Sequence, residues 1–225
     1  GAATLAVVRE AITANPNALI SYRLEAEILS RMGDTEGARQ AMLRYGPETA
    51  GGRMAHVINP KMVHFVCAAT ALSLARLGLY DSALAELERG IEEDSSSPRA
   101  LQLRAKSYLR VAAAFETAGQ ADHREATIRM SLEVFRTAEA FNALAKIEAR
   151  IGDLDTSRQL LEQSVLVNGR QPNVHLALAE LYLATDPDYD RVLYHLDRAQ
   201  ELDETLQDRV RELRERLDAI RGPAP

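Results

Sequence analysis

The sequence predicts an all-α protein built as an α-solenoid of stacked helical hairpins. Its composition favours close helix packing over a sheet, because 46% of the residues are apolar, only 5% are aromatic and Trp is absent. The stronger observation is a block written twice, with a step of 34 residues: Phe141, Leu144 and Ala145 recur as His175, Leu178 and Ala179. In both copies a helical apolar pattern is followed by a polar turn and a second helical segment. A fixed period of this length indicates a stacked repeat array, and its unit is a helical hairpin.

Two stretches identify the kind of hairpin. The second helix is represented best by Gly78-Leu79-Tyr80-Asp81-Ser82-Ala83, with Leu87, Gly90 and Asp94 following. The first helix is represented best by Leu178-Ala179 with Tyr182. These residues resemble the tetratricopeptide repeat (TPR), a 34-residue pair of antiparallel helices. The resemblance covers nearly the whole chain and implies a right-handed α-solenoid of TPR-like hairpins with a C-terminal capping helix. It identifies a scaffold, so function has to be argued from the exposed face.

We expect a single TPR-like array over residues 1–225. Its expected parts are the second helix of a truncated repeat (1–16), a repeat (18–45), an inserted loop (46–60), a repeat (61–94), an extended repeat (98–135), two repeats (138–168 and 172–203) and a capping helix (204–221). Because the first helix that should precede residues 1–16 is missing, we expect the chain to be a fragment of a longer, bacterial-type protein. The inserted loop is inferred because Ala38 and Ala83 hold equivalent places but lie 45 residues apart.

The repeat register predicts which side chains face inward. In the first three full repeats these are Tyr22, Ala26, Leu29, Ala38, Met42 and Tyr45, then Cys67, Ala71 and Leu74, then Leu101, Ala105 and Tyr108. From Leu101 to Phe141 the step is 40 residues, so this hairpin should hold about two extra helical turns. On its second helix, Ala126, Met130 and Val134 are expected to face inward.

A regular apolar stripe marks the end of the chain. Its members are Leu206, Val210, Leu213, Leu217 and Ile220, at steps of four, three, four and three. Such an amphipathic helix suits the terminal cap that a repeat array requires. A short coiled-coil contact is the alternative for the same stripe.

The sequence lacks the patterns that enzymes and metal sites need. The five His residues form no HExxH or HxxxH pair, and no GxxxxGK phosphate loop exists. His64 and Cys67 lie one turn apart, but Cys67 holds a packing position, so a buried thiol is favoured over a metal ligand. Asp186, Asp188 and Asp190 resemble the start of a calcium loop whose Gly and closing Glu are absent. We therefore expect no catalysis, no cofactor and no metal.

Charge and hydropathy exclude two classes of partner. The net charge is −6, which argues against nucleic acid, because binding phosphates requires a basic footprint. No run approaches the roughly 18 apolar residues of a membrane span, and residues 1–8 lack a secretory signal pattern, so membrane insertion is not expected. The cytoplasm is favoured as the compartment, with the periplasm left open.

The exposed faces of the first helices are predominantly basic on this acidic chain. In the TPR family these faces line a concave groove. The residues predicted to line it are Arg23, Glu27, Arg31, Arg76, Arg99, Gln102, Lys106, Arg110, Glu139, Asn142, Lys146 and Arg150. The helix dipole alone could place a cation near the end of each first helix, but it does not explain Arg99, Lys106 or Lys146. Clustered cations suit an acidic or carboxylate-bearing peptide segment.

The resemblance raises one specific version of this binding. Members that grip the acidic C-termini of chaperones use a Lys/Asn/Arg clamp. Here Lys106 and Lys146 stand where that clamp often has Asn, and Asn142 is displaced along its helix, so the pattern is not matched. The leading hypothesis is a non-catalytic protein–protein interaction scaffold that binds a partner segment in the groove. The alternatives are self-assembly through the terminal helix or the extended hairpin, and a regulatory or accessory arm of a larger enzyme or secretion/export protein.

Overall fold

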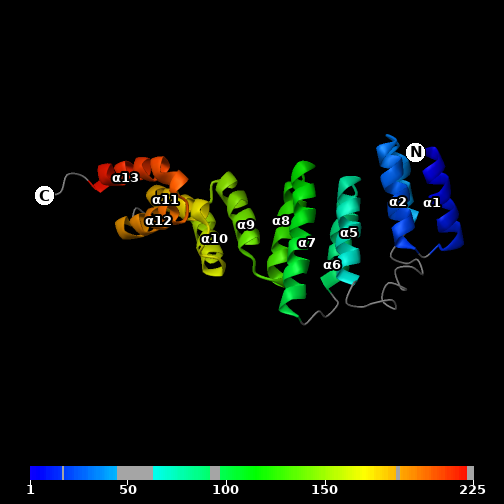
Figure 1. Ribbon diagram of the computed structural model, residues 1–225, viewed down its shortest axis with the longest axis horizontal. Coiled ribbons are helices and arrows are strands. Elements are labelled where there is room, and N and C mark those ends of the chain that lie inside the picture. The colour runs from blue at the N-terminus through cyan, green and yellow to red at the C-terminus, as the bar shows by residue number, and fades with distance from the viewer. Residues whose placement is uncertain (17, 45–62, 92–96, 186–187, 222–225) are drawn as a thin grey trace. The chain divides into compact units, whose positions relative to one another are not determined.

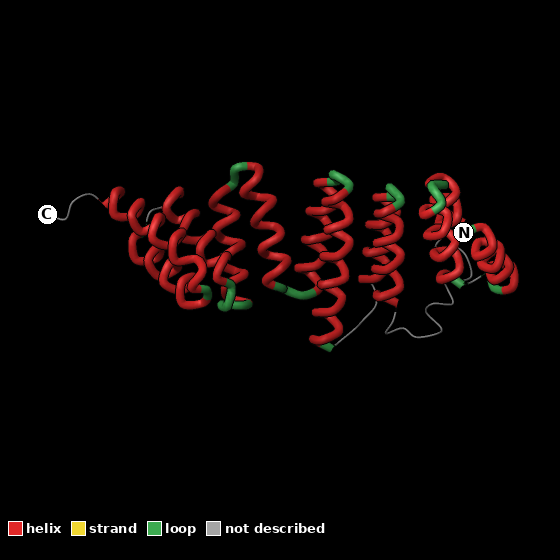
Figure 2. The backbone as a smooth tube through the Cα atoms, turned by 45° about the horizontal axis from the view of Figure 1, so that its top comes forward, coloured by secondary structure: helices red, strands yellow, loops and turns green. Residues whose placement is uncertain are grey.

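The computed structural model describes the whole chain except residues 17, 45–62, 92–96, 186–187 and 222–225. The described residues form twelve α-helices, one short 3-10 helix and no strand, so the all-α prediction is confirmed (Figures 1 and 2). They divide into two compact units, Gly1–Phe135 and Arg136–Pro225. No helix in the described part of the chain combines the length and the apolarity that crossing a membrane requires.

The first unit consists of one single helix and three helical hairpins. These are α1 (Ala2–Ala14), the pair α2 (Leu19–Arg31) and α3 (Thr35–Arg44), the pair α5 (Val63–Arg76) and α6 (Tyr80–Ile91), and the pair α7 (Pro98–Thr117) and α8 (Ala121–Val134). Ten of the side chains predicted to face inward are buried here, with Tyr22, Ala71 and Tyr108 as examples. Leu101 is half-buried. The inserted loop predicted at 46–60 and the predicted packing residue Tyr45 lie outside the described residues.

Each described hairpin of the first unit turns on a glycine in the left-handed region. Gly33, Gly78 and Gly119 have φ of 83°, 77° and 70°, and Gly152 does the same in the second unit with 89°. The N–H after the glycine reaches back five residues, as in the bond from Asp153 N–H to the Glu148 carbonyl oxygen at 3.0 Å. This pattern closes the end of a helix on its own last carbonyl groups, and glycine adopts it without a steric penalty.

The extended hairpin gains its length in its first helix. α7 has 20 residues, against 14 in α8 and 14 in the first helix of the next repeat. Near its turn, α7 packs on the preceding hairpin: Phe115 is fully buried and its ring lies edge-on to Tyr80 of α6, with centroids 5.9 Å apart. His123 of α8 stacks near both rings and contacts Asp81 at 3.1 Å. The additional turns lie at the start of α7, because Pro98 is 21 residues before the turn glycine Gly119, whereas α2 and α9 begin 14 residues before Gly33 and Gly152.

The inward register predicted for α8 is met in part, because Met130 and Val134 pack against the apolar core but are not its most buried residues. The fully buried residues are Thr127, Ile128 and Ser131, whereas Ala126, Met130 and Val134 are only half-buried. Ser131 Oγ donates a hydrogen bond of 2.9 Å to the Ala105 carbonyl oxygen of α7. Small residues let the two helices approach closely, and the serine hydroxyl satisfies a carbonyl oxygen across the contact. A hydrophobic pattern misses this face because its central residues are polar.

The second unit has two hairpins and a terminal helix. They are α9 (Ala138–Ile151) with α10 (Leu154–Val167), α11 (Pro172–Thr185) with α12 (Tyr189–Leu202), the 3-10 helix η2 (Glu204–Leu206) and α13 (Gln207–Arg221). All six residues of the duplicated block that predicted the repeat are buried. The serine contact recurs, because Ser157 and Ser164 of α10 donate to the carbonyl oxygens of Ala145 and Ala138 in α9.

The apolar stripe at the end of the chain packs against the last hairpin of the same chain. Val210, Leu213 and Leu217 are 1%, 0% and 2% exposed and share one apolar core with α11 and α12. Leu206 packs against the same core, whereas Ile220 is 56% exposed. α13 thus covers the last hairpin, as a capping helix does.

Candidate partner-binding surfaces

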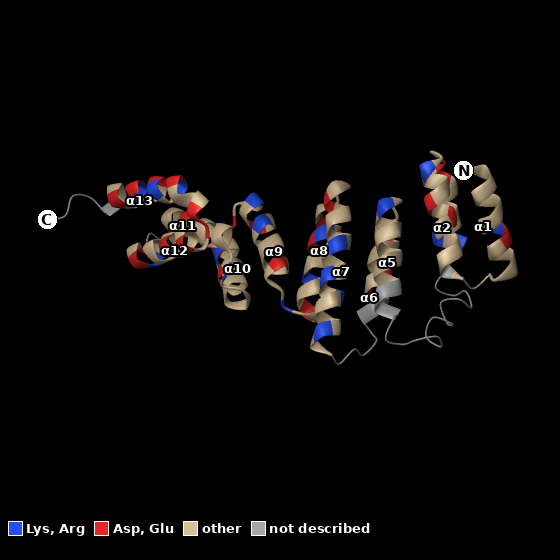
Figure 3. Ribbon diagram, in the orientation of Figure 1, with Lys and Arg blue, Asp and Glu red and all other residues tan. Residues whose placement is uncertain are grey.

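The residues predicted to line a groove lie on the first helices of four hairpins. The structure places Arg23, Glu27 and Arg31 on α2, Arg76 on α5, Arg99, Gln102, Lys106 and Arg110 on α7, and Glu139, Asn142, Lys146 and Arg150 on α9. The first three helices belong to the first unit and α9 to the second. Basic side chains recur along α2, α7 and α9 (Figure 3). The three surfaces differ in how far these charges are already neutralised.

The α7 basic face is formed by Arg99, Lys106 and Arg110 together with Gln102. All four side chains are exposed, and Leu103 beside them is 44% exposed. None of the three cations forms an ion pair with a described residue. The opposite side of the helix is buried through Ala105 and Tyr108, so the packing of the hairpin fixes which way these cations point.

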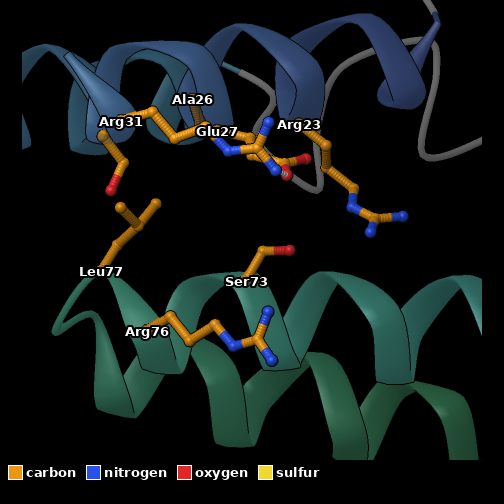
Figure 4. Close-up of a pocket in the computed structure, with 8 residues that line it drawn as sticks. Arg23, Ala26, Glu27, Arg31, Ser73, Arg76 and Leu77 are labelled. Atoms are coloured by element: carbon orange, nitrogen blue, oxygen red, sulfur yellow. Dashed lines mark hydrogen bonds and ion pairs between the residues drawn. The ribbon is translucent and has the colours of Figure 1, made fainter.

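A pocket of about 360 Å³ separates α2 from α5. Four predicted groove residues line it (Arg23, Glu27, Arg31 and Arg76), together with Ala26, Ser30, Ser73 and Leu77. Figure 4 shows Arg23, Glu27 and Arg31 on α2 facing Ser73 and Arg76 on α5 and Leu77 in the turn that follows it. The sequence did not predict Ser30, Ser73 and Leu77 as lining residues. For Ser73 and Leu77 the reason is that only the fold brings the end of α5 opposite α2.

Of the charged side chains that line this pocket, some form an ion pair with each other and others do not. Arg31 Nη2 contacts Glu27 Oε1 at 2.6 Å, so these two residues neutralise each other along one face of α2. Arg23 Nε is shielded from solvent and has no acceptor among the described residues. Arg76 is exposed and forms no ion pair there.

The α9 face differs from the expectation at one residue. Asn142 is half-buried, and its Nδ2 donates to Gln171 Oε1 at 2.8 Å. Gln171 Nε2 in turn donates to Ser164 Oγ at 2.9 Å. Asn142 therefore ties α9 to the start of the next hairpin. Glu139, Lys146 and Arg150 are the exposed members of this face.

Two groups of buried titratable side chains in the described residues serve the helix packing. Glu25 of α2 is fully buried between Arg9 of α1, at 2.9 Å, and Arg44 of α3, at 2.5 Å. Burial alone would raise the pKa of Glu25, but the hydrogen bonds from Arg9 and Arg44 outweigh it and lower the pKa. The second group is the pair His175 and His195, whose Nδ1 atoms are 3.0 Å apart.

Metal ligation finds no support in the described part of the chain. No group of three or more His, Cys, Asp or Glu side chains there could hold a metal ion. Cys67 is buried, and Asp188 caps α12 by accepting a hydrogen bond of 3.1 Å from the Arg191 N–H. The side chain of His64 and residue Asp186 lie outside the described residues.

Comparison with known proteins reveals a shared fold. No protein-family model matches the sequence, and no curated protein matches it. One similar solved structure is the C-terminal part of a TPR repeat-containing protein from Cytophaga hutchinsonii, 12% identical with a TM-score of 0.57 over 95% of this chain and 80% of that chain. MamA is 14% identical, with a TM-score of 0.47 over 84% of this chain and 94% of its own. YrrB, a TPR protein with an unusual peptide-binding site, is 14% identical with a TM-score of 0.46 over 88% and 92%.

At these identities a structural match establishes the fold and nothing finer. The Cytophaga match covers 95% of the chain, and its description as a TPR repeat-containing protein agrees with the helical hairpins described above. The chain is an all-α protein with a TPR-like fold.

Proposed function

We propose that this chain is a non-catalytic protein–protein interaction scaffold whose α7 basic face binds an acidic or carboxylate-bearing segment of a partner protein. The proposal rests on the position of three exposed cations that the folding of α7 does not require. Arg99, Lys106 and Arg110 form no ion pair with a described residue. An unpaired cation on a protein of net charge −6 adds no packing and attracts anions.

The helix dipole does not account for these cations. A cation is favoured only within about the last turn of a helix. Arg31 and Arg76 are the last residues of α2 and α5 and fit that explanation. Arg110 does not, because α7 continues for seven more residues to Thr117. Arg99 is the second residue of α7, where the dipole disfavours a positive charge. The helix dipole therefore explains the positions of Arg31 and Arg76 but not those of Arg99 and Arg110, for which a binding role is the better explanation.

The spacing of the cations describes the segment that would fit them. Along a helix that rises 1.5 Å per residue, Arg99 and Lys106 lie about 10 Å apart, and Lys106 and Arg110 about 6 Å apart. An extended chain covers these distances in roughly three and two residues. A partner strand lying along α7 would thus place carboxylates at about positions i, i+3 and i+5. Exposed Leu103 lies between the cations and offers an apolar contact to the residues between those carboxylates.

The test compares two variants that change the net charge equally. In the first, Arg99, Lys106 and Arg110 are each replaced by Glu; in the second, Arg39, Arg129 and Arg211 are. The probe is a fluorescein-labelled twelve-residue peptide with Asp or Glu at the three spacings above, and fluorescence anisotropy gives its Kd. The α7 variant should weaken binding by at least about tenfold, which corresponds to 1.4 kcal/mol, with an unchanged circular dichroism spectrum. Equal binding by wild type and the α7 variant, or an equal loss in both variants, would overturn the proposal.

A further inference from the structure

The pocket between α2 and α5 has a composition suited to a doubly charged anion. Its lining holds three guanidinium groups, from Arg23, Arg31 and Arg76, and one carboxylate, from Glu27. Because Arg31 is held by Glu27 at 2.6 Å, two net positive charges remain, one on each wall. We propose that this pocket binds a phosphorylated serine or threonine side chain of the partner segment, an inference that rests on the proposed function because that segment carries the phosphate.

Charge decides between a phosphate and a carboxylate. A phosphate monoester carries about −1.5 to −2 charges at pH 7, whereas the side chain of Asp or Glu carries one. A single carboxylate would leave one of the two guanidinium groups of Arg23 and Arg76 without a counter-charge. A phosphate matches both, and its oxygens can accept hydrogen bonds from opposite walls at once.

The hydrogen-bond donors support the same ligand. Arg23 Nε is shielded from solvent and has no acceptor among the described residues, and a buried N–H without an acceptor is costly to fold around. A ligand oxygen would supply this acceptor. Ser30 adds a hydroxyl on the α2 side. Ser73 adds one on the α5 side, and its hydroxyl now donates to the Ala69 carbonyl oxygen at 3.0 Å, so it would rotate to reach the ligand.

The size and lining of the pocket limit what enters it. A volume of about 360 Å³ lies near the lower end of the range for small-ligand sites. Ala26, which is 2% exposed, lies on the α2 side and half-buried Leu77 on the α5 side, and both add apolar surface to the lining (Figure 4). This surface suits the short aliphatic stem of a phosphorylated side chain.

The site is tested with two small probes on the full chain: O-phosphoserine and glutamate, each blocked as the N-acetyl methylamide. Titrations followed through the Nε–H resonances of arginine by NMR report directly on Arg23 and Arg76. The phosphoserine probe should shift both resonances and bind at least about tenfold more tightly than the glutamate probe. Equal affinities for the two probes would overturn the proposal.

Variants then assign the binding to this pocket. Arg23→Gln and Arg76→Gln should each weaken phosphoserine binding at least about fivefold, while Arg39→Gln, an arginine of α3 outside the pocket, should not. Glu27→Gln should tighten it about two- to fivefold, because it frees Arg31. Phosphoserine binding that survives both arginine replacements contradicts the assignment. The α7 residues do not line the pocket, so the two proposals fail separately. If the wild-type chain binds the acidic peptide but does not prefer the phosphoserine probe over the glutamate probe, only the present inference is overturned.

Discussion

His175 and His195 face each other between α11 and α12, with their Nδ1 atoms 3.0 Å apart. His175 Nε2 lies 3.1 Å from the Gly169 carbonyl oxygen, which can only accept, so this nitrogen carries the proton. In a neutral His175 the Nδ1 atom is then the acceptor, and His195 Nδ1–H is the donor. Both rings are buried, at 1% and 8% exposure. The geometry therefore requires His175 Nδ1 to carry no proton, because a proton there would set two donors against each other.

The surroundings of the pair are positively charged on one side. His195 stacks on Tyr182, with centroids 5.7 Å apart, and the Tyr182 hydroxyl donates to Glu162 and accepts from Arg191 at 2.9 Å. Arg158 of α10 lies over the Tyr182 ring and Tyr194 contacts both imidazoles. Burial lowers the pKa of His195 to about 4, helped by His175 and Arg191. Burial also lowers the pKa of His175, opposed by its bond to Gly169.

We predict that the second unit loses stability between about pH 6.5 and pH 4. A histidine whose pKa falls on folding binds its proton more readily in the unfolded chain, so stability is full above pH 6.5 and declines as the pH falls. For His195 the expected loss is on the order of 2 kcal/mol. Thermal unfolding measured from pH 8 to pH 4 checks it. His195→Phe should flatten this decline, and an undiminished decline in His195→Phe would contradict the assignment.

We predict that the free energy of unfolding depends on Glu25 keeping at least one of its two arginine partners. Removing Arg9 or Arg44 alone leaves one ion pair, and each single replacement by Ala should cost about 1 kcal/mol. The double replacement leaves a fully buried carboxylate with no arginine, so we expect a loss of roughly 3 to 5 kcal/mol, more than the two single losses together. Urea unfolding of the two single variants and the double variant completes the cycle. A double loss equal to the sum of the single losses would show that the two arginines act independently.

The capping helix offers a matched pair of apolar residues. Leu213 is fully buried against the last hairpin and Ile220, seven residues later on the same helix, is 56% exposed. Leu213→Ala should destabilise the protein by about 2 to 4 kcal/mol, because it removes buried methyl groups and leaves a cavity. Ile220→Ala should change the free energy of unfolding by less than about 0.5 kcal/mol. Similar losses for the two variants in urea unfolding would mean that α13 does not cover the core.

Two glycines in the second unit separate backbone strain from crowding. Gly152 has φ of 89°, and a Cβ there would meet no atom within 4 Å, so Gly152→Ala should cost about 1 to 2 kcal/mol through its backbone alone. Gly169 has no positive φ, and its Cβ would meet only the Val165 carbonyl oxygen at an ordinary 3.7 Å. Gly169→Ala should therefore be close to neutral. Both are measured by the midpoint of thermal unfolding, and a neutral Gly152→Ala would rule out the left-handed turn.

The candidate site was only partly readable from the sequence. The helical period placed Arg99, Lys106 and Arg110 on the exposed side of one helix, because exposure follows from the burial of Ala105 and Tyr108. The same reasoning gave Asn142 a groove position but did not predict its hydrogen bond to Gln171. Partners across a helix contact cannot be found from spacing, since the two residues lie 29 positions apart in the chain.

The sequence by itself determined the repeating hairpin, the extra length of α7 and the apolar stripe of α13. These features follow from apolar residues that recur every three or four positions, because that spacing indicates which face of a helix is buried. Only the tertiary structure decided which polar groups meet. It buried Glu25 between Arg9 and Arg44, set His175 against His195, and brought Ser73 and Arg76 of α5 opposite Arg23 of α2. Each of these contacts joins polar groups from two different helices, and packing fixes where those helices lie.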